Sequence, residues 1–185
     1  MPRLYLVRHG KPSVGWGESG APDPGLDYTG RAQAEATAAA LASLGPLPVL
    51  VSPLRRTRET AAPLGAHWAL APVVEAAVGE LRAPAGVADH GSWLHEVMSS
   101  TYPTLGPDLA AFRDRVVGRL RMCAVDTVVV THFIAINAAA GAATADERVV
   151  SFAPDHCSVT VLDLVDGRLE LVVRGGEAAT VVQAG

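Results

Sequence analysis

Three short apolar runs of the sequence each end on side chains that could do chemistry. The runs are followed by Arg8 and His9, by Arg55 and Arg56, and by His132. Arginine and histidine together form a cationic cluster, and the guanidinium group binds oxyanions through several N–H donors at once. Such a cluster is complementary to a compact dianion such as a phosphoryl group.

The apolar runs themselves are LYLV at 4–7, VLV at 49–51 and TVVV at 127–130. Each is too short for a helix and too continuous for a half-exposed strand, which is the pattern of buried parallel strands. In an open α/β sheet, ligands bind in the crevice outside the carboxyl ends of the parallel strands. We therefore expect the polar side chains that follow the three runs to converge at this edge.

Helical segments separate these predicted strands. TGRAQAEATAAALASLG at 29–45 is Ala-rich, and Thr29 is its expected cap. After the second strand we expect a helix with Ser52 as N-cap and Pro53 in the first helical position. A third helix is expected to begin at or beside His132. Together these segments alternate as strand and helix.

The remaining segments indicate how the chain is completed. Residues 108–123 place apolar side chains on one helical face, and a short helix is expected near 92–100. The segment 158–174 alternates like two strands with a turn at Asp166-Gly167, which predicts a hairpin. We find no linker or internal repeat. The sequence predicts one domain over 1–185, of the α/β class, with helices on both faces of a mixed, mostly parallel sheet.

Composition excludes several classes of function. The formal net charge of −4 leaves no broad basic field for a nucleic acid or an anionic membrane. Cys123 and Cys157 have neither zinc-site nor disulfide-framework spacing, which favours a reducing cytoplasm. The most apolar stretch, 127–145, contains His132 and Asn137 and is rich in Ala and Gly, so we do not expect a membrane span. No signal peptide is recognisable.

Several motifs resemble those of the histidine phosphatase superfamily, which includes the cofactor-dependent phosphoglycerate mutases. The motifs are LVRHG at 6–10, GLDYTGRAQA at 25–34, SPLRRTRETA at 52–61, VGEL at 78–81 and VVTHF at 129–133. RHG alone is a weak match, but RHG with the SPLxRTxxTA block is specific. The resemblance covers most of residues 3–160. It implies a three-layer α/β/α sandwich with a mostly parallel central sheet, like that of phosphoglycerate mutase.

The resemblance also implies roles for particular side chains. His9 would be the nucleophile that becomes a phosphohistidine, and Arg8, Arg56 and His132 would hold the phosphoryl oxygens. Glu80 would protonate the leaving oxygen. The implied reaction is hydrolysis of a small phosphate ester. We expect no metal and no other cofactor, because fixed guanidinium groups supply the positive charge that the phosphoryl oxygens need.

The sequence leaves some assignments open. Glu75 is a rival of Glu80 as the general acid, and His156 follows a turn-like segment near the expected site without a clear role. Residues one apart on a helix are rotated by about 100°, so Arg55, Arg56 and Arg58 do not all face the crevice. The resemblance selects Arg56, and Arg55 and Arg58 are expected to be solvated surface charges.

Two departures from the family pattern bear on function. Phe133 stands where the family often has Gly, and Ser13-Val14-Gly15-Trp16 stands where mutases commonly have Asn, which counts against mutase chemistry. An isomerase of the phosphoglycerate mutase type and a non-catalytic domain that binds a phosphorylated ligand are the alternatives to a phosphatase. A homodimer is an assembly that the sequence leaves open.

Overall fold

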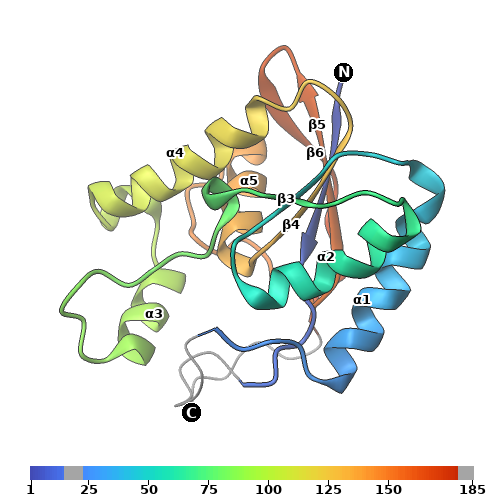
Figure 1. The fold of residues 1–185 in the computed structure, drawn as a ribbon. Coiled ribbons are helices and arrows are strands. Elements are labelled where there is room, and N and C mark those ends of the chain that lie inside the picture. Colours follow the sequence, from blue (N-terminus) through green and yellow to red (C-terminus); the bar gives the residue numbers. More distant parts are fainter. Residues whose placement is uncertain (15–22, 179–185) are drawn as a thin grey trace.

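The computed structural model describes residues 1–14 and 23–178, with one six-stranded sheet between two layers of helices (Figure 1). The strands are β1 (Arg3–Arg8), β2 (Val49–Val51), β3 (Val73–Val74), β4 (Thr127–Thr131), β5 (Val159–Val165) and β6 (Arg168–Val173). The helices are α1 (Tyr28–Leu41), α2 (Arg55–His67), α3 (His90–Met98), α4 (Pro107–Arg121) and α5 (Phe133–Thr144). Short 3-10 turns cover Ala42–Leu44, Ala76–Val78 and Tyr102–Thr104. This confirms the expected α/β/α sandwich.

The sheet is parallel except at one side. Its strand order is β3-β2-β4-β1-β5-β6. The first four strands in this order, β3, β2, β4 and β1, are all parallel to one another. The antiparallel hairpin of β5 and β6 completes the sheet beside β1. Asp166 and Gly167 at its turn have φ angles of 48° and 76°, which a two-residue hairpin turn requires. β3 was not predicted, because its two valines are 59% and 56% exposed at the sheet edge.

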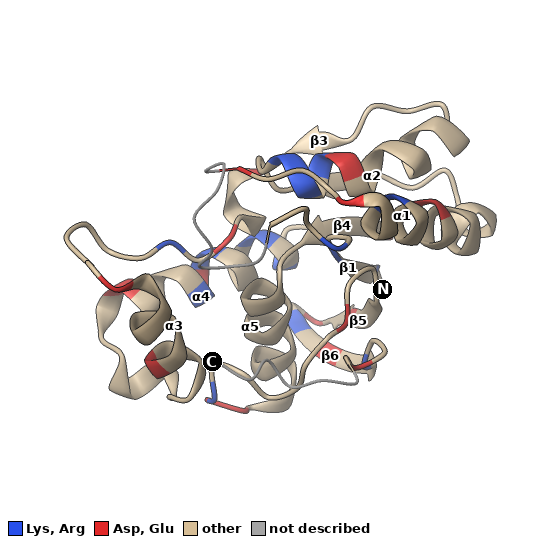
Figure 2. Cartoon of the chain, turned by 90° about the horizontal axis from the view of Figure 1, so that it is seen from below, with Lys and Arg blue, Asp and Glu red and all other residues tan. Residues whose placement is uncertain are grey.

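Both faces of the sheet are covered, which explains the continuous apolar runs. On one face α1 and α2 pack over Val7 and Val130, whereas on the other α4 and α5 pack over Leu6 and Val129. Figure 2 looks onto the carboxyl edge of the parallel strands and shows these two helical layers. Every residue of α5 from Phe133 to Gly141 is buried, so this segment needs no polar face. No helix in the described ranges is long and apolar enough to cross a membrane.

Two helices begin differently from the sequence prediction. The N-cap of α1 is Asp27, whose carboxylate accepts the Gly30 N–H at 2.7 Å, rather than Thr29. An aspartate one turn before the Ala-rich body therefore supplies the cap. α2 begins at Arg55 rather than at Pro53, with the extended Leu54 before it. The Ser52 hydroxyl is consequently available for another partner.

A close approach of two glycines fixes the loop that follows β1. A Cβ on Gly10 would lie 2.6 Å from the carbonyl oxygen of Gly30 at the start of α1. The Gly10 N–H donates to Thr60 Oγ1 on α2 at 2.9 Å, and the Lys11 N–H donates to Gln33 Oε1 at 3.0 Å. The third residue of the RHG motif is therefore a glycine because the loop contacts the helix backbone directly.

Candidate active site

The predicted side chains meet at the carboxyl edge of the sheet. Oε2 of Glu80 lies 3.2 Å from His132 Nδ1 and 3.5 Å from the Arg56 guanidinium. The His9 ring lies edge-on to the His132 ring, with centroids 5.3 Å apart. Arg8 precedes His9 at the end of β1. The parallel strands thus bring together residues that are far apart in the sequence.

His9 is held in one orientation and one protonation state. Its backbone N–H donates to the Thr131 carbonyl at 3.0 Å, and its Nδ1 lies 2.8 Å from the Gly10 carbonyl oxygen. Since a carbonyl only accepts, Nδ1 carries the proton and Nε2 keeps its lone pair. The residue is 5% exposed. Burial, and then the charges of His132 and Arg56, hold the pKa of His9 well below its usual value of 6.5.

Arg8 is held by two contacts that leave part of its guanidinium group free. One terminal nitrogen donates to the Pro154 carbonyl at 2.8 Å, and the guanidinium carbon lies 5.1 Å from the ring centre of Phe133. The buried Nε has no hydrogen-bond partner among the described residues. Phe133, the departure from the family pattern, therefore stacks under Arg8.

Only one arginine at the start of α2 faces the site. Arg56 is 8% exposed and points toward Glu80 and His132. Arg55 instead pairs with Glu59 at 2.7 Å on the helix surface, and Arg58 is exposed to solvent. The rotation of about 100° per residue separates the three, as expected.

Hydrogen bonds of the neighbouring residues Val78 and Leu81 hold Glu80 beside the strand ends. The hydroxyl of Thr131 donates to the Val78 carbonyl at 2.6 Å, and Glu80 Oε1 accepts the Leu81 N–H at 3.0 Å. Burial alone would raise the pKa of Glu80, but the charges and hydrogen bonds of His132 and Arg56 bring it below its usual value. Glu80 is therefore ionised in this arrangement.

Glu75, the rival acid, has a different set of partners. It accepts the Ala77 N–H at 3.0 Å and pairs with the Arg119 guanidinium at 2.6 Å. These contacts lower the pKa of Glu75. The structure places Glu80, and not Glu75, beside the two histidines.

His132 is the N-cap of α5 and is completely buried. Its Nε2 lies 2.7 Å from Ser52 Oγ. The ionised Glu80 carboxylate accepts from Nδ1, and the Ser52 hydroxyl is the hydrogen-bond partner of Nε2 on the other side of the ring. Ser52 was predicted as a helix cap, and its position beside a strand end was the signal that it also faces the site.

His156, whose role the sequence left open, also lies in the cluster. Its ring centre is 5.6 Å from that of His9. Burial, and then the positive charge of Arg8, lower the pKa of His156 to about 4, so its imidazole is neutral at neutral pH. The segment that carries His156 also carries the Pro154 carbonyl that holds Arg8. Gly15 and Trp16, which belong to the Ser13-Val14-Gly15-Trp16 segment that stands where mutases commonly have Asn, lie outside the described residues.

Comparison with known proteins agrees with this geometry. The model of the histidine phosphatase superfamily (branch 1) matches residues 4–175. This chain belongs to the histidine phosphatase superfamily. A comparison with curated protein sequences gives no match.

Solved structures of similar fold include several phosphatases. A mycobacterial glucosyl-3-phosphoglycerate phosphatase in complex with VO3 is 26% identical, with a TM-score of 0.72 over 94% of this chain and 98% of that one. A mutant phosphoserine phosphatase from Entamoeba histolytica in complex with phosphoserine is 18% identical, with a TM-score of 0.73 over 94% and 96% of the two chains. At that identity the likeness concerns the fold alone. Family membership and these neighbours support an enzyme of the phosphatase kind.

The residues of this site could bind either an anion or a metal ion. Ligand atoms of His9, Glu80 and His132 all lie within 4.8 Å of one another. A divalent cation there would lie beside the Arg56 guanidinium, which is 3.5 Å from Glu80. Like charges repel strongly at such distances in a buried site, so the electrostatics favours an anion.

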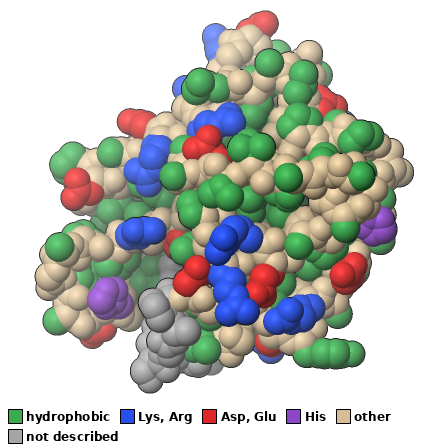
Figure 3. Space-filling view, viewed as in Figure 1, with side chains coloured by type: hydrophobic (Ala, Val, Ile, Leu, Met, Phe, Trp, Pro, Cys, Tyr) green, Lys and Arg blue, Asp and Glu red, His purple; other side chains and the backbone are tan. Residues whose placement is uncertain are grey.

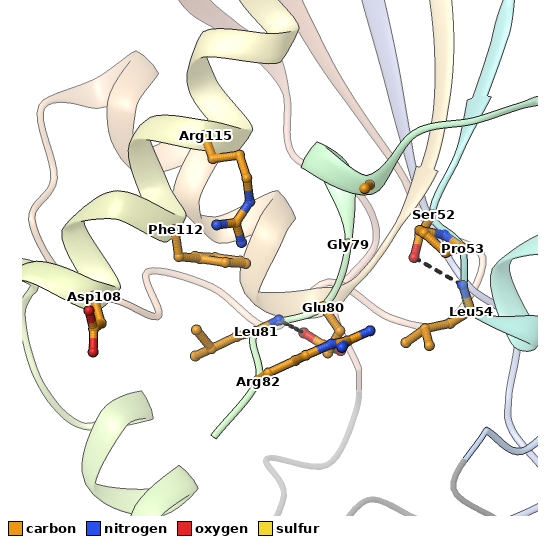
Figure 4. A pocket seen from close by; sticks show the side chains of 11 residues that line it. Ser52, Pro53, Leu54, Gly79, Glu80, Leu81, Arg82, Asp108, Phe112 and Arg115 are labelled. Atoms are coloured by element: carbon orange, nitrogen blue, oxygen red, sulfur yellow. Dashed lines mark hydrogen bonds between the residues drawn. The ribbon is translucent and has the colours of Figure 1, made fainter. Parts of the chain in front are cut away.

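A cavity of about 500 Å³ opens beside Glu80 and Ser52 (Figure 4). Its other walls come from the segment after β2, from residues 79–82 and from α4. The cavity therefore begins at Glu80 and Ser52 and extends toward α4. Elsewhere, on the face shown in Figure 3, basic and acidic side chains are interspersed.

Proposed function

We propose that this protein is a phosphomonoesterase that hydrolyses a small phosphate ester through a phosphohistidine on His9. The observation that carries the proposal is the state of His9, which is neutral and has Nδ1 tied to the Gly10 carbonyl. The His9 ring lies edge-on to the His132 ring at a centroid distance of 5.3 Å, and the Arg56 guanidinium lies 3.4 Å from His132, so Nε2 is proposed to meet the phosphoryl group beside these two side chains. An imidazole nucleophile divides the hydrolysis into two easier displacements.

In the first displacement, Nε2 of His9 forms a bond to phosphorus and the ester P–O bond breaks. Glu80 gives its proton to the leaving oxygen, and the alcohol departs. In the second, the oxygen of a water attacks phosphorus while the Glu80 carboxylate takes one water proton. The N–P bond breaks and inorganic phosphate leaves as its monoanion together with the proton that Glu80 took, so that His9 is again neutral and Glu80 again ionised.

The proposal requires Glu80 to acquire a proton when the substrate binds. Without a bound phosphate ester, His132 Nδ1–H and the Arg56 guanidinium stabilise the carboxylate. The same donors are proposed to bind the phosphoryl oxygens, so substrate entry removes them from Glu80 and adds a negative charge beside it. Both changes raise the pKa of Glu80. A substrate monoanion supplies the proton, because phosphate monoesters have a second pKa of about 6.

Arg8, Arg56 and His132 are proposed to hold the phosphoryl oxygens in both displacements. Charge builds up on these oxygens in the transition state, and preplaced donors stabilise it without reorganisation. The free Nε of Arg8 and the buried position of Arg56 support this role. No metal ion is assigned a step.

The experiment that tests the proposal is trapping of the phosphoenzyme. The protein is mixed with ³²P-labelled p-nitrophenyl phosphate and quenched within one turnover. We expect a label that is acid-labile and base-stable on the wild-type protein and absent from His9→Ala. Binding without label and without turnover would mean a phosphoryl-binding domain, and transfer of the label to a second phosphate ester in place of water would mean a mutase.

We also propose a cytoplasmic location and a single domain over 1–185. Cys123 and Cys157 are both free and buried, as in proteins of reducing compartments. The small-molecule substrate follows from the enclosed site, and a homodimer stays compatible with the proposal.

A further inference from the structure

Arg8 rests on two neutral supports that come from different parts of the chain. One is the Pro154 carbonyl, which accepts from a terminal guanidinium nitrogen at 2.8 Å. The other is the Phe133 ring, whose centre lies 5.1 Å from the guanidinium carbon. No ion pair engages Arg8 in the part of the chain that the structure describes. Because neither support carries a charge, the positive charge of Arg8 is left for an anion.

The two supports must keep a fixed spacing if Arg8 is to stay in one place. An arginine side chain has several rotatable bonds, and donors stabilise a transition state best when they are placed before the reaction. Phe133 is buried in the first turn of α5, but Pro154 belongs to residues 145–158, which lie between α5 and β5. Backbone hydrogen bonds join this segment to residues 176–178. A link between the segment and α5 is also needed.

The Asn137 side chain supplies this link. It lies on α5 one turn after Phe133 and is completely buried. Its Nδ2 donates to the Phe133 carbonyl and to the Phe152 carbonyl, both at 3.1 Å. Its Oδ1 accepts the N–H groups of Ser151 at 2.8 Å and of Phe152 at 3.2 Å. One amide group therefore ties the first turn of α5 to the segment that carries Pro154.

These contacts use the whole hydrogen-bonding capacity of the Asn137 amide. Both Nδ2 hydrogens and both Oδ1 lone pairs have backbone partners. Asn137 is also the only polar residue in the buried run from Phe133 to Gly141. An apolar side chain there would fill the core equally well but would leave buried backbone groups without partners. The amide is therefore matched to joining the two segments.

We propose that Asn137 is a positioning residue for Arg8. By fixing the Phe133 ring and the Pro154 carbonyl relative to each other, it holds the guanidinium where it meets the phosphoryl group. Asn137 itself touches neither the substrate nor the reacting atoms. This role rests on the proposed function, because it requires Arg8 to hold the phosphoryl oxygens.

The test is a double-mutant cycle between Asn137 and Arg8, measured as binding of inorganic phosphate by calorimetry. Phosphate binding needs no turnover, so all the variants can be compared. We expect Arg8→Ala to weaken binding about tenfold or more, and Asn137→Ala to weaken it about threefold to tenfold. In the Arg8→Ala background, Asn137→Ala should weaken binding by less than about 1.5-fold, because the side chain that it positions is gone.

Phe133→Leu is a second variant, which leaves Asn137 in place and removes the ring under Arg8. It should weaken phosphate binding about twofold to fivefold, and it too should have no further effect in the Arg8→Ala background. Asn137→Ala leaves a cavity and unpaired backbone groups. If it does not fold, the cycle of Phe133→Leu with Arg8→Ala decides, and additive losses there overturn the proposal.

Thr127→Ala is the matched control for a general loss of stability. Thr127 is buried at the first residue of β4, whereas the site lies at the other end of this strand, and its hydroxyl donates to the Val125 carbonyl. The variant should unfold at a lower urea concentration than wild type and bind phosphate with unchanged affinity. A loss of affinity as large as that of Asn137→Ala would overturn the proposal, because destabilisation alone would then explain both.

Additive losses in the cycle of Asn137 and Arg8 would also overturn the proposal, as would wild-type phosphate affinity in either Asn137→Ala or Arg8→Ala. The trapping experiment separates these failures from failure of the proposed reaction. A labelled His9 with additive losses rejects only the role of Asn137. Coupled losses without a label on His9 support the positioning of Arg8 and reject the phosphohistidine.

Discussion

Nδ1 of His132 lies 3.2 Å from Oε2 of Glu80. This contact joins a group proposed to hold the phosphoryl oxygens to the group proposed to protonate the leaving oxygen. The Arg56 guanidinium, which is also proposed to hold the phosphoryl oxygens, lies 3.5 Å from the Glu80 carboxylate. If a bound phosphoryl group takes both donors, as proposed, substrate binding and the protonation of Glu80 are linked in this site.

The linkage predicts how activity depends on pH. The proton on Glu80 arrives with the monoanion of the substrate, whose second pKa is about 6. As pH rises through that value, the monoanion disappears, so kcat/KM should fall by about tenfold per pH unit at higher pH. The measurement is kcat/KM for an alkyl phosphate between pH 5 and pH 9. A profile that is flat or rising over this range would contradict the assigned source of the proton.

Two neighbouring arginines of α2 offer a matched comparison. Arg56→Ala removes a buried donor from the phosphoryl site and should lower kcat/KM by an amount equivalent to about 3 kcal/mol, as the loss of an oxyanion donor does. Arg58→Ala removes an exposed charge of the same helix and should stay within about threefold of wild type. Similar losses of kcat/KM in both variants would mean that the total positive charge at the start of α2 determines activity, and not a contact between Arg56 and the phosphoryl group.

Much of this site could be predicted from the sequence because its residues stand at strand ends. Each buried parallel strand is recognisable as a short apolar run, and the residue after it must lie at the carboxyl edge. Arg8, His9 and His132 could be placed in this way. The family resemblance then distinguished Arg56 and Glu80 from their neighbours.

Other features depend on contacts that no local pattern reports. β3 is two residues long and exposed, so it has no apolar signature. Asp27 and Ser52 are both good helix caps by type, and only packing decides that the first caps α1 whereas the second binds His132. The proximity of His156 to His9 results from the return of the chain before β5, which no periodicity reveals.

Removal of metal ions should leave the activity intact. In the proposed mechanism guanidinium groups meet the phosphoryl charge, so exhaustive dialysis against EDTA should reduce turnover of p-nitrophenyl phosphate by less than about twofold. The apo protein is then titrated with Mg²⁺ and Zn²⁺. Loss of activity that either ion restores would assign the ligand atoms of His9, Glu80 and His132 to a metal site.

Stability should fall between pH 6.5 and about pH 4, partly because of His156. Its pKa is about 4 in the folded protein, below the usual 6.5, so the unfolded chain binds the proton first as pH decreases. The contribution of His156 to the free energy of unfolding is fully present above pH 6.5 and should have decreased by about 2 kcal/mol at pH 4.5. Urea unfolding of wild type and His156→Asn at pH 8 and pH 4.5 measures it.

In that comparison His156→Asn should lose less stability than wild type on going from pH 8 to pH 4.5. The measurement at pH 8 is the control, because there neither the folded nor the unfolded state protonates this side chain. His9, whose pKa is also lowered, acts in the same direction and keeps some pH dependence in the variant. Identical losses in both proteins would show that His156 takes up its proton equally well when folded.

The role of Glu80 can be tested through the leaving group. A general acid helps most where the leaving oxygen is a poor leaving group, so Glu80→Gln should slow phosphorylation of His9 by an alkyl phosphate far more than by p-nitrophenyl phosphate. We expect the two losses to differ by about tenfold or more. The rates compared must be those of phosphoenzyme formation, because a slow hydrolysis step common to both substrates would hide the difference. Glu75→Gln is the matched control, since Glu75 is bound to Arg119 away from the histidines and should show no selective loss. Equal losses on both substrates in Glu80→Gln would mean that Glu80 positions Arg56 and His132 without transferring a proton.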